Sequence, residues 1–336
     1  MGLLNLNMIS TLKGKETKKK FMQIANLLVN TRIPLYLTGP SGSGKSAMAM
    51  SLAKWYAEEN KVPAYYIQLS PDQTKTSVIL GLRMIKGSLV PSNGVVADCM
   101  ESGGICIVDE ATHSTQELLL MFNGILDRTS VTSIGDKIIH AKDSTRFIFC
   151  SNDSDYAGNV KIPQSFAQRI ITLPFNYPPE EEEALIAKKM VTEDISECVM
   201  SNATIKYVTS IVREHRSKSF PLSVRNIANA IIMMQVMLND KTKEELDIEI
   251  EKINKNAGEA KVRKIYQRIY NKELLNFNSA FNDKNIKSFF EDVANIGIEQ
   301  FKECILSSCM YYIDIEGFGI DILEEKEKLK MSILSE

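Results

Sequence analysis

The sequence has few of the residues that build metal sites or disulfide frameworks. Its 336 residues include three histidines, one tryptophan and six cysteines, and no two cysteines follow C-x-x-C spacing. Several cysteines lie in apolar runs, so we expect reduced packing residues and neither zinc ligands nor disulfides. No apolar run is long enough to cross a bilayer, and the N-terminal residues lack a secretory signal pattern. We therefore expect a cytoplasmic protein with no membrane partner.

The charge balance argues against a nucleic-acid-binding protein. The chain has 40 Lys and Arg residues against 42 Asp and Glu residues, and its formal net charge is −2. This balance gives no general attraction to nucleic acid or to acidic membranes. The hydrophobic content of 44% and charged content of 24% are those of an ordinary globular protein. The length is sufficient for two domains with an appendage.

A glycine-rich stretch follows the first apolar run and organises the interpretation of the rest. Residues 35–49 read LYLTGPSGSGKSAMA and match the phosphate-loop pattern G-x-x-x-x-G-K-[ST] between a strand-like run and a helical pattern. Inward-turned N–H groups of such a loop bind anions at a helix N-terminus. We predict that Lys45 reaches the β- and γ-phosphates of ATP and that the Ser46 hydroxyl ligates Mg²⁺. The predicted ATP-binding residues are Gly39, Pro40, Ser41, Gly42, Ser43, Gly44, Lys45, Ser46 and Asp109.

Two acidic residues follow another apolar run, at residues 105–108. A continuous apolar run is typical of a strand that is covered on both faces of a sheet. Ligands of open parallel sheets bind at the carboxyl ends of the strands. We therefore expect Asp109 to hold Mg²⁺ through water and Glu110 to polarise the attacking water. Another strand-like run, residues 146–150, is followed by Ser151, Asn152 and Asp153, and we predict that Asn152 orients that water.

The segments SFAQRI, NYPPEEEE and LSVRN complete a series that resembles MoxR-type AAA+ ATPases. The resemblance covers residues 20–240. It is strongest to the branch of rubisco-activase Q-type proteins, nitric-oxide-reductase activators, gas-vesicle N-type proteins and the small cobaltochelatase subunit. It implies an α/β P-loop NTPase fold, with a three-layer parallel-sheet core, a helical lid and a helical C-terminal extension. The expected domains are residues 1–175, 176–240 and 241–336.

The resemblance also implies roles for two arginines. Arg169 in SFAQRI corresponds to the arginine finger, and Arg225 in LSVRN corresponds to the second sensor near the nucleotide. In this family the finger reaches the nucleotide of a neighbouring subunit, so the resemblance implies a homo-oligomer, with a hexamer as the expected form. Arg128 lies at the end of a predicted helix, and the sequence leaves open whether it acts across a subunit boundary or only packs.

The remaining expectations concern the client of this predicted ATPase. Residues 71–94 resemble the hairpin insertion that faces the ring pore in this branch, and the family works beside a von Willebrand factor A-type partner protein. The leading interpretation is a ring-forming ATPase that remodels, activates or assembles a partner protein or metalloenzyme complex. The alternative is a nucleic-acid translocating or loading ATPase, with Arg83 and Lys86 of the insertion meeting phosphates. The near-neutral charge and the lack of a recognisable DNA-binding module argue against that alternative.

Overall fold

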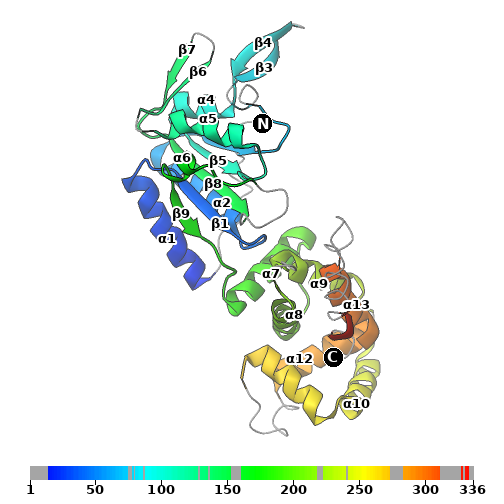
Figure 1. The fold of residues 1–336 in the computed structure, drawn as a ribbon. Helices are drawn as coiled ribbons and strands as arrows, with labels where there is room; N and C mark the ends of the chain where they lie inside the picture. The colour runs from blue at the N-terminus through cyan, green and yellow to red at the C-terminus, as the bar shows by residue number, and fades with distance from the viewer. Residues whose placement is uncertain are drawn as a thin grey trace. The chain divides into compact units, whose positions relative to one another are not determined.

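The chain folds into two compact units, Met1–Tyr177 and Pro178–Glu336 (Figure 1). Within the described residues, no helix is both long enough and apolar enough to cross a membrane. The computed structural model describes residues 14–74, 78, 80–85, 88–127, 129–134, 137–152, 160–217, 222–239, 241–272, 283–310, 327 and 330–332. For residues 80–85, 88–91, 134, 137, 254–257, 259 and 310 the description covers the backbone alone.

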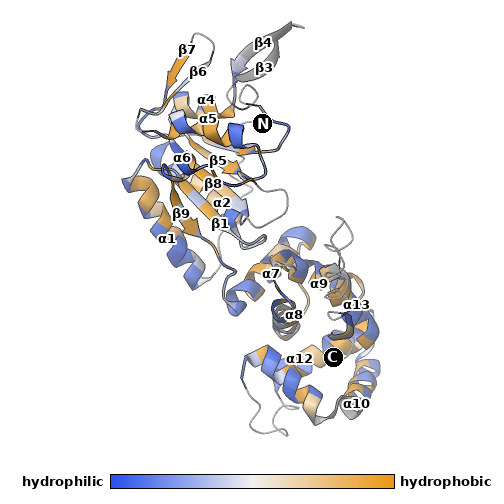
Figure 2. Cartoon of the chain, in the orientation of Figure 1, coloured by the Kyte–Doolittle hydropathy of each residue, from blue (hydrophilic) through white to orange (hydrophobic). Residues whose placement is uncertain are grey.

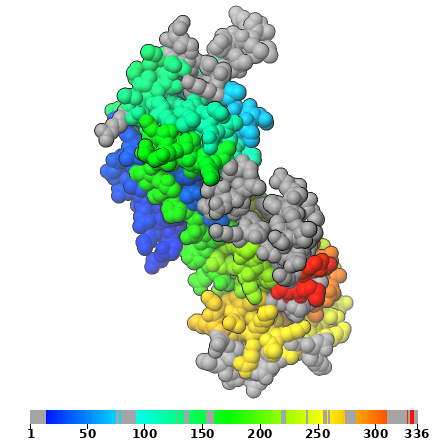
Figure 3. Space-filling view, viewed as in Figure 1, coloured from blue at the N-terminus to red at the C-terminus, as the bar shows by residue number. Residues whose placement is uncertain are grey.

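A five-stranded parallel sheet forms the centre of the first unit, in the strand order β2-β5-β8-β1-β9 (Figure 1). The strands are β1 (Leu35–Gly39), β2 (Ala64–Gln68), β5 (Ile105–Asp109), β8 (Arg146–Asn152) and β9 (Ile171–Pro174). The helices of this unit are α1 (Lys15–Asn30), α2 (Lys45–Asn60), α4 (Val95–Ser102), α5 (Gln116–Leu126) and α6 (Gln164–Ala167). Figure 3 shows α1, in blue, along the outer side of the unit.

Alternate residues of the central strands face two separate cores. Ile107 and Ile148 pack with the buried residues of α1 and α2, whereas Val108 and Phe149 pack with those of α4 and α5. Successive side chains of a strand point to opposite faces, so a strand covered on both faces must be apolar throughout. Figure 2 shows this concentration of hydrophobic residues on β5 and β8. The predicted three-layer α/β core is confirmed.

Two antiparallel hairpins extend from this core. One pairs β3 (Leu80–Ile85) with β4 (Ser88–Asn93), and the other pairs β6 (Val131–Ile134) with β7 (Lys137–His140). The first confirms the hairpin that was predicted within residues 71–94. The side chains of Arg83 and Lys86, which the nucleic-acid alternative places against phosphates, lie outside the described part of the chain.

The second unit is helical, and a single core runs through it. Tyr207 of α8 packs its ring against Phe289 of α12, with ring centroids 4.6 Å apart, and against Phe301 of α13 at 6.1 Å. The boundary that we predicted at residue 240 therefore falls inside one packed unit, because helices on both sides of it share buried residues. The helices are α7 (Glu180–Ile195), α8 (Asn202–Glu214), α9 (Val224–Val236), α10 (Lys243–Tyr270), α12 (Lys284–Ile296) and α13 (Ile298–Met310).

Phe149 tests the packing of the sheet against α5. Its ring is fully buried between Phe122 and Phe166, with edge-on contacts at 5.2 and 5.1 Å between ring centroids. We expect Phe149→Ala to lower the free energy of unfolding of the first unit by about 3–5 kcal/mol, because it leaves a cavity. Denaturant unfolding would measure the loss. Ile138→Ala is the control, because Ile138 is 63% exposed, and a loss of equal size there would contradict the prediction.

Candidate functional site

The carboxyl ends of three adjacent strands bring the predicted site residues together. Gly39 at the end of β1 is in register with Asn152 at the end of β8. On the other side of β8, β5 pairs in parallel through Val108 and Phe149, which places Asp109 at the same edge. Sequence reasoning predicted this meeting, since each motif follows a strand of one parallel sheet.

The loop between β1 and α2 has the backbone of an anion site. Gly42 and Gly44 have φ values of 72° and 88°, which side chains rarely tolerate, and Gly44 is the N-cap residue of α2. The N–H of Ser43 donates to the carbonyl of Pro40 at 3.3 Å, which closes the turn. Ser46 lies in the first turn of α2 and is half-buried. A helix N-terminus with turned-in amides favours a negatively charged ligand.

Lys45 is buried in the middle of this loop, with 6% of its surface exposed. Its ammonium donates to the carbonyl oxygens of Gly39 at 2.9 Å and Pro40 at 2.8 Å, and to Oδ1 of Asn152 at 3.1 Å. A buried cation needs such oxygen partners, because desolvation alone would strongly disfavour its charge. The predicted phosphate lysine and the predicted water-orienting amide are therefore in direct contact.

Asp109 is held by one hydrogen bond at each carboxylate oxygen. Its Oδ1 accepts from the N–H of Glu110 at 3.0 Å, and its Oδ2 accepts from the hydroxyl of Tyr66 at 3.2 Å. Tyr66 lies on β2, and its pKa is raised above the ordinary tyrosine value, first by burial and then by the negative charge of Asp109. Sequence reasoning missed Tyr66, since the segment AYYIQL indicates a strand but not the partner of its second tyrosine.

Glu110 has an unusual backbone conformation for a residue other than glycine. Its φ is 52°, and the next residue, Ala111, donates its N–H to the carbonyl of Cys150 at 2.9 Å. Left-handed conformations cost a non-glycine residue about 1–3 kcal/mol, and they gather at functional sites. Burial raises the pKa of the Cys150 thiol well above its usual value, so Cys150 acts as packing beneath this edge of the sheet.

The two predicted arginines lie on later segments of the chain than the phosphate loop. Arg169 follows α6, donates to the carbonyl of Ser165 at 2.6 Å and lies 3.5 Å from the carboxylate of Asp127. Within the described residues, its Nε has no hydrogen-bond partner. Arg225 is exposed in the first turn of α9, in the second unit. Arg128 lies outside the described residues.

The site's own atoms fit a nucleotide phosphate and Mg²⁺. Among the described residues, the hydroxyl oxygen of Ser43 is buried without a hydrogen-bond partner, as expected of a donor that faces a ligand. A Cβ at Gly44 would meet no atom within 4 Å, so the loop backbone is open to close approach. Ser46 and Asp109 supply the hydroxyl and carboxylate oxygens that suit Mg²⁺.

Comparisons with known proteins agree with this arrangement. Residues 34–170 match the family described as AAA domain (dynein-related subfamily). Protein CbbQ of Hydrogenophilus thermoluteolus is 23% identical over 159 residues, which are 46% of this chain and 58% of that protein. Protein NorQ of Paracoccus denitrificans is 22% identical over 162 residues, 47% of this chain and 58% of that protein. Uncharacterized protein SH1500 of Staphylococcus haemolyticus is 28% identical over 161 residues, 46% of this chain and 59% of that protein.

The family match lies in the nucleotide-site part of the molecule. The chain spans just under three-fifths of the length of each of these curated relatives. The matched residues 34–170 run from the residue before β1 to the residue before β9, so they include the phosphate loop, Asp109, Glu110, Asn152 and Arg169.

Gly39 allows a test of how the loop is held. Its φ is 153°, and a Cβ there would lie 2.0 Å from the carbonyl oxygen of Phe175. We expect Gly39→Ala to displace the loop, to lower the free energy of unfolding by more than about 2 kcal/mol and to weaken ATP binding. Gly258→Ala is the control. The φ of Gly258 is also positive, at 63°, but a Cβ at Gly258 would meet no atom within 4 Å. Equal effects of the two changes on ATP affinity, measured by calorimetric titration, would contradict this view.

Proposed function

We propose that this chain is a MoxR-type AAA+ protein that binds ATP with Mg²⁺ and hydrolyses it, since its residues 34–170 match the dynein-related AAA domain. The observation that carries the proposal is the contact of 3.1 Å between the Lys45 ammonium and Oδ1 of Asn152. It joins the phosphate-binding cation to the amide that would orient water, at the sheet edge that also holds Asp109 and Glu110.

Backbone hydrogen-bond donors and charged side chains bind different parts of the nucleotide and its Mg²⁺. Backbone N–H groups of the loop bind phosphate oxygens, and Lys45 neutralises the negative charge of the β- and γ-phosphates. Ser46 ligates Mg²⁺ directly and Asp109 ligates it through water, with its carboxylate held by Tyr66 and by the Glu110 N–H. Bound Mg²⁺ supplies charge neutralisation of the transferred phosphoryl group.

Hydrolysis depends on the proton of the attacking water. Glu110 accepts that proton, and its position directly after β5 supports this role. Asn152 holds the water in line through its amide. Arg225 of α9 adds positive charge at the phosphates, as the second sensor of this family does.

Arg169 acts on the nucleotide of a neighbouring copy. In this chain its described contacts are with Ser165 and Asp127, and none is with the phosphate loop. A guanidinium presented in this way supplies the transition-state charge in trans, a contribution that is large in phosphoryl transfer. The active form is therefore a homo-oligomeric ring, with a hexamer expected from the family.

The ring uses hydrolysis to remodel, activate or assemble a partner protein. Support comes from the similarity to CbbQ and NorQ and from the family pattern of work beside a von Willebrand factor A-type protein. The six cysteines are unpaired, and all but Cys198 are buried, which supports a reducing compartment such as the cytoplasm.

Glu110→Gln separates binding from hydrolysis. We expect a loss of kcat on the order of 10²–10⁴-fold, because an amide cannot accept the proton, while the Kd for ATP changes little. The rate of phosphate release measures kcat, and calorimetric titration measures the Kd for ATP. Glu117→Gln is the matched control, because Glu117 is exposed in the first turn of α5. Undiminished turnover in the Glu110 variant would mean that another group is the base.

Arg169→Ala tests action across the subunit boundary. We expect turnover to fall on the order of 10³-fold with ATP binding retained, because the lost charge acts in the transition state. Arg32→Ala is the control, since the Arg32 side chain is 58% exposed and pairs only with an exposed Asp143 in its described contacts.

Mixed assemblies decide between neighbouring and internal action of Arg169. Lys45→Ala subunits have an intact finger but a defective loop, so mixing them with Arg169→Ala subunits creates interfaces with both parts intact. We expect activity to recover in part, measured as phosphate release against the mixing ratio. If co-assembly is demonstrated and activity does not recover, Arg169 acts within its own subunit.

A further inference from the structure

A fully buried carboxylate lies at the start of the second unit. Glu183 is in the first turn of α7 and has none of its surface exposed. Its N–H donates to the carbonyl of Pro179 at 2.9 Å, so the residue is fixed where the chain enters the unit. A carboxylate in such a place needs strong partners, because it has lost its hydration.

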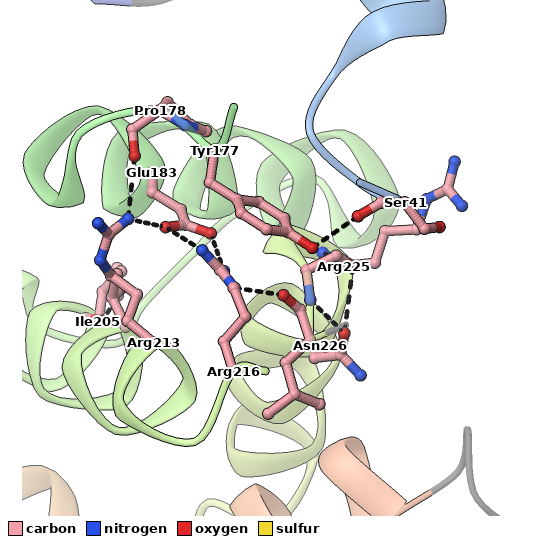
Figure 4. Close-up of polar contacts among 12 residues, drawn as sticks. Ser41, Tyr177, Pro178, Glu183, Ile205, Arg213, Arg216, Arg225 and Asn226 are labelled. Atoms are coloured by element: carbon pink, nitrogen blue, oxygen red, sulfur yellow. Dashed lines mark hydrogen bonds and ion pairs between the residues drawn. The ribbon is translucent and has the colours of Figure 1, made fainter. Parts of the chain in front are cut away.

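Two arginines supply those partners (Figure 4). Arg213, in the last turn of α8, pairs with Oε2 of Glu183 at 2.5 Å. Arg216, which follows α8, pairs with Oε1 and also lies 3.3 Å from Oε2. The side chain of Arg216 is 10% exposed, so this pair is shielded from water. We call Glu183, Arg213 and Arg216 the Glu183 cluster.

Each arginine of the Glu183 cluster also holds a backbone carbonyl. Arg213 donates to the carbonyl of Pro178, the first residue of the second unit, at 2.9 Å. Arg216 uses its Nε to donate to the carbonyl of Leu222 at 2.5 Å. The planar guanidinium has donors on several edges, so it can bind a carboxylate and a carbonyl at once.

Leu222 leads directly into the helix that carries Arg225. The next residue, Ser223, is the N-cap of α9, and its side chain accepts from the N–H of Arg225 at 3.2 Å. Asn226 completes the cap, with its Oδ1 accepting from the N–H of Ser223 at 2.8 Å. The position of Leu222 therefore sets where α9 begins and from where the Arg225 side chain extends.

The linker before Pro178 is tied to the phosphate loop. The hydroxyl of Tyr177 donates to the carbonyl of Ser41 at 2.9 Å, within the first unit. Pro178 is the next residue, and its carbonyl accepts from Arg213 of the Glu183 cluster, within the second unit.

We propose that Glu183, Arg213 and Arg216 are positioning residues that fix Arg225 relative to the linker, an inference that rests on the role proposed above for Arg225. Stability alone is a poor reason for the cluster, because apolar side chains of similar volume often stabilise a buried site as well as an ion pair does. Directional bonds give what apolar packing lacks, a defined placement of two backbone carbonyls. The cluster thus makes the linker and the start of α9 a single rigid element.

Arg216→Lys is the sharpest test, because a single ammonium keeps the charge beside Glu183 but lacks the separate donor for Leu222. We expect kcat/KM for ATP hydrolysis to fall roughly tenfold to hundredfold, the scale of a small misplacement. Arg268→Lys is the matched control. Arg268 is as buried, with its side chain 6% exposed, and pairs with Glu214 at 2.6 Å, but its described contacts do not include the start of α9. The control should retain wild-type kcat/KM.

A double-mutant cycle distinguishes positioning from a structural role. On an Arg225→Ala background, Arg216→Lys should cause no further loss, because its effect passes through Arg225. A full additional loss on that background, or no loss in the single variant, would overturn the inference while leaving the role of Arg225 intact. If Arg225→Ala alone leaves hydrolysis unchanged, the proposed role of Arg225 is wrong, and this inference falls with it.

Glu183→Gln is a second variant that tests the Glu183 cluster independently of Arg216→Lys. The amide keeps the shape of the carboxylate but removes its charge, so it should repeat the loss of Arg216→Lys and its disappearance on the Arg225→Ala background. If both variants fail to fold, as judged by circular dichroism, the cluster serves stability and the inference is overturned.

Discussion

The burial of one ammonium group constrains the architecture of the first unit. Lys45 has almost no contact with water, so oxygen atoms must surround it, and the loop supplies the carbonyls of Gly39 and Pro40. The third oxygen, from Asn152, comes from a strand more than a hundred residues later in the chain. The pairing of β8 with β1 is thus favoured in part by the hydrogen bond that Asn152, the last residue of β8, accepts from Lys45.

The sequence predicted those parts whose signal is local. A phosphate loop, an apolar strand with two acids and a strand ending in Asn152 each combine an element with its chemical group in a few residues. Because all three strands are parallel, their carboxyl ends had to share one edge of the sheet, and the contact of Lys45 with Asn152 agrees. The three-layer core was implied by the resemblance to AAA+ ATPases, and the apolar runs agree with it, since strands covered on both faces are apolar throughout.

The parts that the sequence did not reveal depend on partners far apart in the chain. Tyr66 looks like any strand tyrosine until β2 is paired with β5, which brings it to Asp109. Glu183 sits in a run of four glutamates, and nothing in that run distinguishes the fully buried one. Helical periodicity likewise shows that a helix has a buried face without showing what covers it. For that reason residue 240 looked like a boundary, although α8 packs on α12 and α13.

The strand order also has a consequence for synthesis of the chain. β1 is made early, yet its two neighbours in the sheet are β8 and β9, at residues 146–152 and 171–174. While a ribosome is still translating the segment between them, β1 has no strand to pair with and Lys45 lacks the Asn152 oxygen. Such non-local pairing folds slowly and leaves apolar strands exposed on the way. The nucleotide site is therefore among the last parts of the first unit to form.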